Sequence, residues 1–222
     1  LLYVAKVLNS SGGGYTSDVL SALDWCEAQN VSVISMSIGS GAYDGYCDSE
    51  IAADSVNRLA AKGILVVAAS GNGGNSSIKS PACASLALPV AASTKTGTIA
   101  GFSSFNNATL LVAPGSSIQT IGKDGTAKTV SGTSMSVPFV SGTASLVLEN
   151  RALNASQMKK LLIYSGDIIN SSGRQFAQVN AWNAINNIIT NNLTQPATLV
   201  GNETSGNFSA QYTPCSSLSF ST

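Results

Sequence analysis

The stretch Ile64-Leu65-Val66-Val67-Ala68-Ala69 decides the fold class. It is a short apolar run, rich in β-branched residues, that follows Gly63 and ends at Ser70-Gly71. This pattern predicts a strand that is buried on both faces. Such strands belong to parallel sheets whose two faces are covered by helices. The stretch therefore predicts an α/β protein with three layers and a mostly parallel sheet.

The segments before this stretch alternate between strand and helix patterns, as expected for βαβ units. Ser17 is a suitable N-cap for the first helix, and Gly63 ends the second. The expected elements are a strand over residues 3–8, a helix over 18–29, a strand over 31–38 and a helix over 49–62.

The segments after it predict further short strands and then three helices. Lys123-Asp124-Gly125 reads as a hairpin turn, and Asn154 with Gln157 forms a capping-box pattern. The expected strands cover residues 88–92, 110–113, 118–121 and 127–130, and the helices cover 134–149, 154–164 and 179–189. From residue 191 onward Asn, Thr, Ser and Pro dominate, so residues 1–190 are expected to form one domain. Residues 191–222 are expected to be a linker and the start of a β-rich module.

Composition excludes several classes of protein. Hydrophobic residues make up 44% of the 222 residues and charged residues only 10%, which allows a large core under a polar surface. The 11 basic and 11 acidic residues give zero net charge and no basic run, so a nucleic-acid partner is not expected. No apolar run approaches the roughly 20 residues of a membrane-spanning helix.

Nine Asn-X-Ser/Thr acceptor patterns favour a secreted or cell-surface glycoprotein. They begin at Asn9, Asn30, Asn75, Asn107, Asn154, Asn170, Asn192, Asn202 and Asn207. Cys26 lies beside Trp25 on an apolar helix face, which favours a buried free thiol. Cys47 and Cys83 lie in polar loops, where a disulfide is favoured over a metal site.

The segment Ser131-Gly132-Thr133-Ser134-Met135-Ser136-Val137-Pro138 has the pattern of a serine nucleophile at the start of a helix. The helix N-terminus would help to hold an anionic intermediate. A serine hydroxyl needs a neighbouring base, usually histidine, and the sequence contains no histidine. Taken alone, the segment favours a simple helix cap over a nucleophile.

Asn72 is a candidate partner for this serine. It lies in Ser70-Gly71-Asn72, at the carboxyl end of the most buried strand, where α/β sheets bind their ligands. Its side-chain amide can donate to an oxyanion that develops on a substrate carbonyl. The alternative is an ordinary Asn-Gly turn.

Together these segments resemble the subtilisin-like serine proteases, the subtilases. Three motifs carry the resemblance in the family's order: Val33-Ile34-Ser35-Met36-Ser37-Ile38-Gly39, Val66-Val67-Ala68-Ala69-Ser70-Gly71-Asn72, and Gly132-Thr133-Ser134-Met135-Ser136-Val137-Pro138. Shorter matches support them at residues 5–8, 102–104 and 112–115. The resemblance covers about residues 1–190 and implies a serine endopeptidase that forms an acyl-enzyme.

The resemblance also implies roles for individual residues. Ser134 would be the nucleophile, and Asn72 would be the oxyanion-hole donor together with the Ser134 backbone N–H. The primary specificity pocket would be lined by Ser37, Ile38, Gly39, Ala69, Ser70 and Gly71, and the substrate backbone would pair with Gly12, Gly13 and Gly14. The chemistry would need no cofactor, although a structural calcium ion is compatible with it. A bridge between Cys47 and Cys83 would flank the pocket, which leaves Cys215 unpaired within the chain.

Lys79 carries a separate hypothesis. It precedes Ser80-Pro81, where the pocket wall of the family lies, so its charge would favour acidic side chains at the cleavage position. A solvated surface lysine is the alternative.

The family's catalytic aspartate and histidine lie upstream of all the matched motifs, and neither has a counterpart here. We therefore expect the chain to be a carboxyl-terminal part of a catalytic domain, inactive alone, that needs an amino-terminal part of the same domain. Two other readings stay open. One is a secreted surface or adhesion protein that has lost the triad, and the other is a sedolisin-like acid protease, against which Asn72 argues.

Overall fold

The computed structural model describes residues 1–190, and the side chains of residues 1–186. Its centre is a six-stranded sheet in the order β1-β3-β5-β6-β10-β9. All neighbouring pairs are parallel except the edge strand β9, which runs antiparallel to β10. The strands are β1 Val33–Met36, β3 Leu65–Ala69, β5 Leu88–Ser93, β6 Leu111–Pro114, β9 Asp167–Ser171 and β10 Arg174–Gln178.

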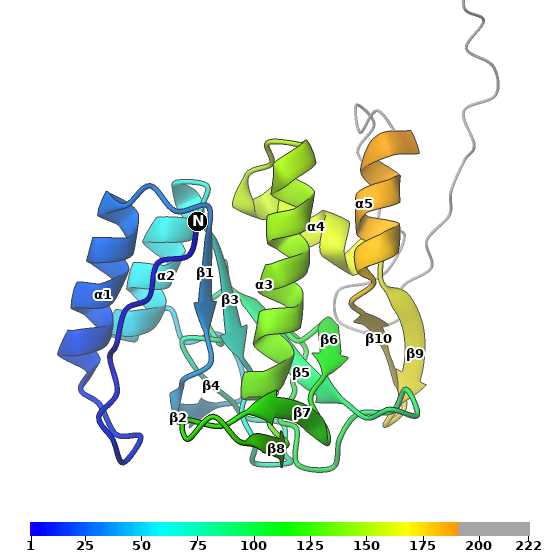
Figure 1. Cartoon of the computed structure of the whole chain (residues 1–222), viewed down its shortest axis with the longest axis horizontal. Helices are drawn as coiled ribbons and strands as arrows, with labels where there is room; N and C mark the ends of the chain where they lie inside the picture. The colour runs from blue at the N-terminus through cyan, green and yellow to red at the C-terminus, as the bar shows by residue number, and fades with distance from the viewer. Residues whose placement is uncertain (191–222) are drawn as a thin grey trace, which may run out of the picture.

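Helices cover both faces of this sheet, as the sequence predicts (Figure 1). Leu65 and Val67 face a core formed with the second group of helices, whereas Val66 faces the core formed with the first group. This alternation follows from the two-residue period of a strand. The first group is α1 Thr16–Ala28 and α2 Ile51–Ala61, and the second is α3 Thr133–Asn150, α4 Ala155–Tyr164 and α5 Ala181–Thr190.

The longest helix, α3, packs across the sheet. Its buried residues Val137, Val140, Ala144 and Val147 are spaced by three or four and therefore share one face. The capping box predicted for α4 is present, since Asn154 and Gln157 bond each other's backbone N–H groups at 2.9 and 3.0 Å. None of the helices described is long and apolar enough to cross a membrane.

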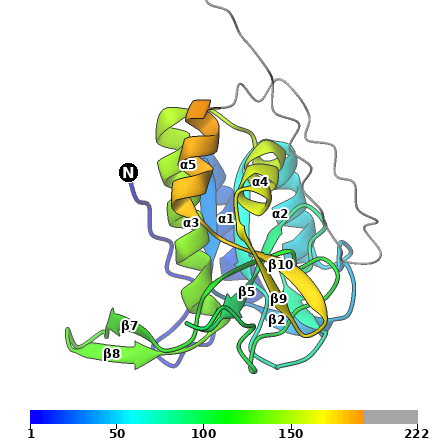
Figure 2. The ribbon, with the colours of Figure 1, turned by 90° about the vertical axis from the view of Figure 1, so that its right-hand side faces the viewer.

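Two pairs of short strands lie outside the main sheet. Strands β2 Ser40–Tyr43 and β4 Ile78–Ser80 pair antiparallel beyond the carboxyl ends of β1 and β3 (Figure 1). Strands β7 Ile118–Ile121 and β8 Ala127–Val130 form the predicted hairpin, which projects from the body of the molecule (Figure 2).

Several predicted details are wrong. Residues 3–8 form no strand, because they have no hydrogen-bonded neighbour; Tyr3 instead packs edge-on against Trp25 of α1, with ring centroids 5.8 Å apart. Ser17 does not cap α1, which begins at Thr16, two residues before the expected start, with Tyr15 as its N-cap. The strand expected over residues 31–38 is shorter, and the sequence patterns did not reveal β2, β4, β9 and β10.

Candidate active site

Ser134 lies in the first turn of α3, at the end of the molecule that also holds β2 and β4 (Figure 1). The segment before it is fastened to the end of β6. The Gly132 N–H donates to the Gly115 carbonyl at 2.8 Å, and the Ser136 hydroxyl donates to the Ala113 carbonyl at 3.0 Å. Strand β6 therefore fixes where α3 starts and where Ser134 points.

A second anchor joins Ser134 to the end of β1. Its hydroxyl donates to the Ser37 carbonyl at 3.1 Å, and the Ser37 hydroxyl donates to the Ser134 carbonyl at 2.9 Å. The Ser134 carbonyl is free to accept this bond because Pro138, four residues on, has no N–H to offer it. The proline four residues after Ser134 thus leaves the Ser134 carbonyl available as the acceptor for the Ser37 hydroxyl.

Asn72 is oriented by Thr133, the residue before the serine. The Asn72 Oδ1 atom accepts the Thr133 N–H at 2.8 Å and the Thr133 hydroxyl at 3.0 Å. A backbone N–H can only donate, so the atom that faces it must be the oxygen, and the Asn72 Nδ2 group points elsewhere. Nδ2 has no acceptor in the described part of the chain, and Asn72 is exposed. Ser134 is the second residue of α3, where helix N–H groups have no intrahelical acceptor.

The segment that carries Asn72 is held in place by hydrogen bonds to Ser104. The buried Ser70 donates from its hydroxyl to the Ser104 carbonyl at 2.6 Å, and the Ser104 N–H donates to the Gly71 carbonyl at 2.9 Å. The Gly71 N–H donates to the Thr133 hydroxyl at 3.2 Å, which ties this segment to the serine segment. A Cβ on Gly132 would lie 3.3 Å from the Asn72 amide nitrogen, so a glycine there leaves room for the amide.

The residues expected to line a pocket gather around these anchors. Residues 37–39 follow β1, and residues 69–71 start at the last residue of β3, the strand paired with β1. Strand β4 connects the two segments: the Lys79 N–H donates to the Ser70 carbonyl at 2.9 Å, and Ser80 is paired with Ser40. Both segments reach the serine segment through the hydrogen bonds of Ser37 and Gly71 described above.

This geometry agrees with a comparison of the sequence with known families. The subtilase family model, Peptidase_S8, matches residues 1–197. The chain belongs to the subtilase family. Its sheet and helix layers are those of the subtilisin-like fold: it superposes on the crystal structure of a cold adapted subtilisin-like serine proteinase with a TM-score of 0.69 and 33% identity. That match covers 79% of this chain and 65% of the other.

Individual subtilases show the same likeness. Subtilisin Savinase from Lederbergia lenta is 37% identical over 146 residues, which is 66% of this chain and 52% of the relative. Alkaline serine exoprotease A from Vibrio alginolyticus is 36% identical over 163 residues, which is 71% of this chain and 29% of the relative. The chain thus spans about half or less of the length of these relatives.

This subtilase chain has a disulfide between Cys47 and Cys83, with Cα atoms 5.4 Å apart and both residues buried. The bridge joins the loop after β2 to the loop after β4. Next to it, the Asp48 carboxylate accepts the Ser85 N–H, and this hydrogen bond lowers the Asp48 pKa. Cys26 is a free, partly buried thiol whose pKa is raised by burial. Cys215 lies outside the described residues.

The three glycines expected to pair with substrate, Gly12, Gly13 and Gly14, are exposed at the same end of the molecule as β2 and β4 (Figure 1). Their loop is closed by Asn9, whose N–H donates to the Gly13 carbonyl at 2.8 Å. The Asn9 side chain also accepts the Gly13 N–H at 3.1 Å. In the described part of the chain these glycines have no contact with Ser134, so their role in pairing with the substrate backbone stays a prediction.

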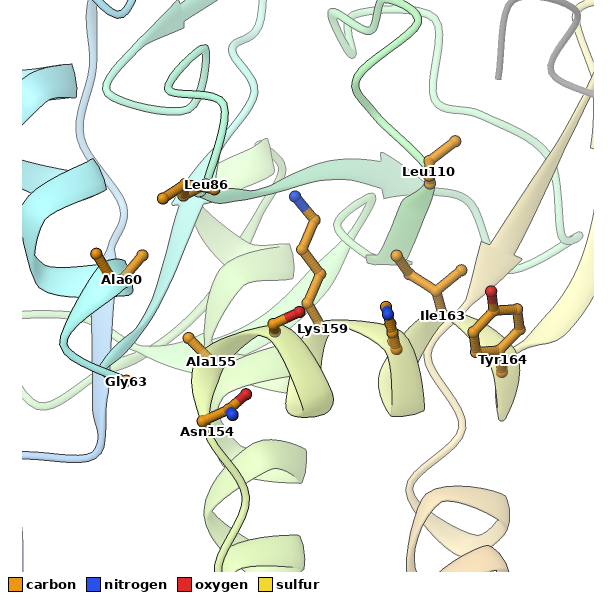
Figure 3. Close-up of a pocket in the computed structure, with 12 residues that line it drawn as sticks. Ala60, Gly63, Leu86, Leu110, Asn154, Ala155, Lys159, Ile163 and Tyr164 are labelled. Atoms are coloured by element: carbon orange, nitrogen blue, oxygen red, sulfur yellow. The ribbon is translucent and has the colours of Figure 1, made fainter. Parts of the chain in front are cut away.

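A separate cavity of about 510 Å³ lies under α4, lined mostly by apolar side chains (Figure 3). Lys159 reaches into it from α4, and its ammonium donates to the Ala87 carbonyl at 2.8 Å. Burial lowers the Lys159 pKa, because desolvation disfavours the charged form. None of the site residues predicted from the sequence lines this cavity.

Sequence reasoning missed two residues that organise the site. Thr133 bonds both Asn72 and Gly71, and Gly115 receives the N–H that fixes the serine segment. Thr133 lies inside the serine motif, but nothing in its residue type indicated that it would join the start of α3 to the segment after β3. A Cβ on Gly115 would lie 2.6 Å from the Ala92 Cβ, so the close approach explains the glycine.

Proposed function

We propose that this chain carries the nucleophile and oxyanion hole of a serine endopeptidase. Ser134 attacks the substrate carbonyl carbon and forms an acyl-enzyme, which water then hydrolyses. The Asn72 amide and the Ser134 backbone N–H donate to the oxygen that becomes negative in the transition state. The observation that supports this proposal is the bond from Thr133 to Asn72 Oδ1, because it leaves the Nδ2 donor free beside Ser134.

The general base must come from outside this sequence, since the 222 residues contain no histidine. The hydrogen-bond acceptor of Ser134 within the described part is the Ser37 carbonyl, which cannot take up the hydroxyl proton. We therefore propose that an amino-terminal part of the same catalytic domain supplies the histidine and the aspartate that orients it. This chain alone should then show little or no proteolysis.

The free edge of β1 supports a place for that part. Within the described residues β1 pairs only with β3, and a groove of about 730 Å³ separates its other edge from residues 1–7. Ser35, Met36 and Ser37 line this groove, so a segment that added to the β1 edge would end beside Ser134. The groove also exposes Leu2 and Val4, which are 84% and 76% accessible.

The proposed setting is extracellular, and the substrates are proteins or peptides. The six acceptor asparagines in the described part of the chain, which begin the patterns at residues 9, 30, 75, 107, 154 and 170, are all exposed. The disulfide between Cys47 and Cys83 is also typical of an oxidising compartment. We propose the same roles as above for residues 12–14, 37–39 and 69–71 in substrate binding.

Hydrolysis of an unfolded protein and of short peptides by the full-length gene product tests this function. Activity should require Ser134, so Ser134→Ala should lose it. Ser21→Ala removes an exposed hydroxyl from α1, away from the groove and the site, and should keep it. A folded full-length protein without hydrolysis would contradict the proposal and support a catalytically inactive surface protein. Activity confined to strongly acidic pH would instead indicate a carboxylate base.

A further inference from the structure

Lys79 lies between the two segments that flank Ser134. Its stem fills the space over two glycines: a Cβ on Gly39 would lie 2.7 Å from the Lys79 Cβ, and a Cβ on Gly71 would lie 2.9 Å from the Lys79 Cγ. Any side chain at either glycine would therefore have to displace the lysine. The Lys79 Cε atom lies 3.6 Å from the same point at Gly71, so the stem runs along the residue that precedes Asn72.

The position of this stem is fixed by its backbone. The Lys79 N–H donates to the Ser70 carbonyl at 2.9 Å, and the Lys79 carbonyl accepts the Cys83 N–H at 3.0 Å. The segment that contains Lys79 is also held by the pairing of β4 with β2 and by the disulfide at Cys83. Lys79 is thus a half-buried residue of a rigid wall rather than part of a free surface loop.

The charge of this lysine has no counter-charge in the described part of the chain. The ion pairs found there belong to Arg58, Lys62 and Lys128. The Lys79 ammonium has no hydrogen-bond acceptor there either. A lysine ammonium without an acceptor or an ion-pair partner favours a ligand that brings a carboxylate, because hydrogen bonds between charged groups are the strong ones.

The substrate residue that would meet this cation follows from the site geometry. The attacked carbonyl carbon lies at Ser134 and its oxygen points toward Asn72. In the proposed function residues 37–39 and 69–71 bind substrate, so the side chain of that same residue lies between these segments, which bond Ser134 and Thr133. Lys79 lies across this space.

We propose that Lys79 makes this site select substrates with glutamate or aspartate immediately before the cleaved bond. This specificity rests on the proposed function, because it concerns the substrate of the same serine. A charged hydrogen bond of this kind is expected to favour a glutamate peptide over the equivalent glutamine peptide by about tenfold to a hundredfold in kcat/KM.

The test uses the full-length protein and four peptides that differ only in the residue before the cleaved bond: Glu, Gln, Phe and Lys. The ratio of kcat/KM for Glu to that for Gln should be about ten or more in the wild type. It should fall to near one in Lys79→Met, remain high in Lys79→Arg, and reverse toward the Lys peptide in Lys79→Glu. Lys95→Met, which removes an exposed lysine outside the site, should leave the ratio unchanged.

The results separate the two proposals. Cleavage of all four peptides with a Glu to Gln ratio near one in the wild type would overturn the role of Lys79 and leave the protease function intact. A high ratio that survives in both Lys79→Met and Lys79→Glu would overturn that role as well, because the preference would then come from other residues. If a folded full-length protein cleaves none of the peptides, the proposed function fails and the specificity fails with it.

Discussion

Removal of the Cys47–Cys83 disulfide should produce a large and calculable loss of stability. The bridge closes a loop with a sequence separation of 36 residues. A cross-link over a loop of this length lowers the entropy of the unfolded chain by an amount equivalent to about 4 kcal/mol at 25 °C. For a domain of this size, that loss corresponds to a fall in Tm of about 8–15 °C.

The assay is equilibrium unfolding in guanidinium chloride without reductant. The full-length protein should carry Ser134→Ala in every sample, so that self-digestion does not distort the transition. The double variant Cys47→Ala/Cys83→Ala is compared with Cys26→Ala, which removes a partly buried thiol without opening a cross-link. The double variant should lose about 4 kcal/mol, and the control about 1 kcal/mol or less.

Two results would refute this reasoning. A loss below about 1 kcal/mol in the double variant would mean that the bridge does not constrain the unfolded chain as supposed. A loss in Cys26→Ala equal to that of the double variant would assign the effect to lost packing. Reduction of the protein that carries only Ser134→Ala should reproduce the double variant, because both treatments open the same loop.

Three further changes test the site and its surroundings. Asn72→Asp keeps the oxygen that holds the serine segment but replaces the Nδ2 donor with a negative oxygen, so kcat of the full-length protein should fall by about 10²–10³ with unchanged Tm. That range was measured on a subtilisin and is carried over to this relative, and an unchanged kcat would exclude the oxyanion role. Gly115→Ala should lower the free energy of unfolding by about 1–3 kcal/mol, because the new Cβ would lie 2.9 Å from a backbone oxygen. Gly101 has open space around it, so Gly101→Ala should change the free energy of unfolding by less than about 0.5 kcal/mol. Equal effects of the two substitutions would contradict the contact at Gly115. Lys159→Met should raise Tm at pH 7. Burial lowers the pKa of Lys159, so the folded state carries a desolvation penalty while the ammonium is charged. This penalty disappears as the pH rises through the folded and then the unfolded pKa of the lysine. The gain should therefore shrink between pH 7 and 10.5 and be absent in the exposed control Lys160→Met; a gain independent of pH would refute the titration account.

The sequence predicted the central part of the fold because its strands are buried. The continuous apolar run at residues 64–69 follows from burial of its strand on both faces. The apolar spacing in α3 follows from burial of that helix on one face. The β9–β10 hairpin was not predicted because its strands are largely polar and only partly buried, with Phe176 and Ala177 as their buried residues. Ser172 and Gly173 in its turn both have positive φ angles. The Ser-Gly pair is a turn signal in the sequence that could have revealed the hairpin.

Residues 3–8 show the opposite error. Their pattern is that of a strand, but a strand also requires a neighbour to pair with, and no sequence pattern indicates whether that neighbour is present. In the site, the motif order was enough to predict that Ser134 and Asn72 would be close. The sequence could not show that Thr133 connects them, since that contact depends on how α3 meets the segment after β3. It also could not show that Lys79 lies over Gly39 and Gly71, since that contact depends on the pairing of β4 with β2.

The central claim is that Ser134 is an activated nucleophile once the amino-terminal part of the domain is present. Its most direct test is reaction of the full-length protein with a fluorophosphonate, followed by mass spectrometry of the modified peptide. The phosphonyl group should be found on Ser134, and the 222-residue chain alone should react far more slowly. A folded full-length protein that stays unmodified, or carries the group on another serine, would contradict the claim.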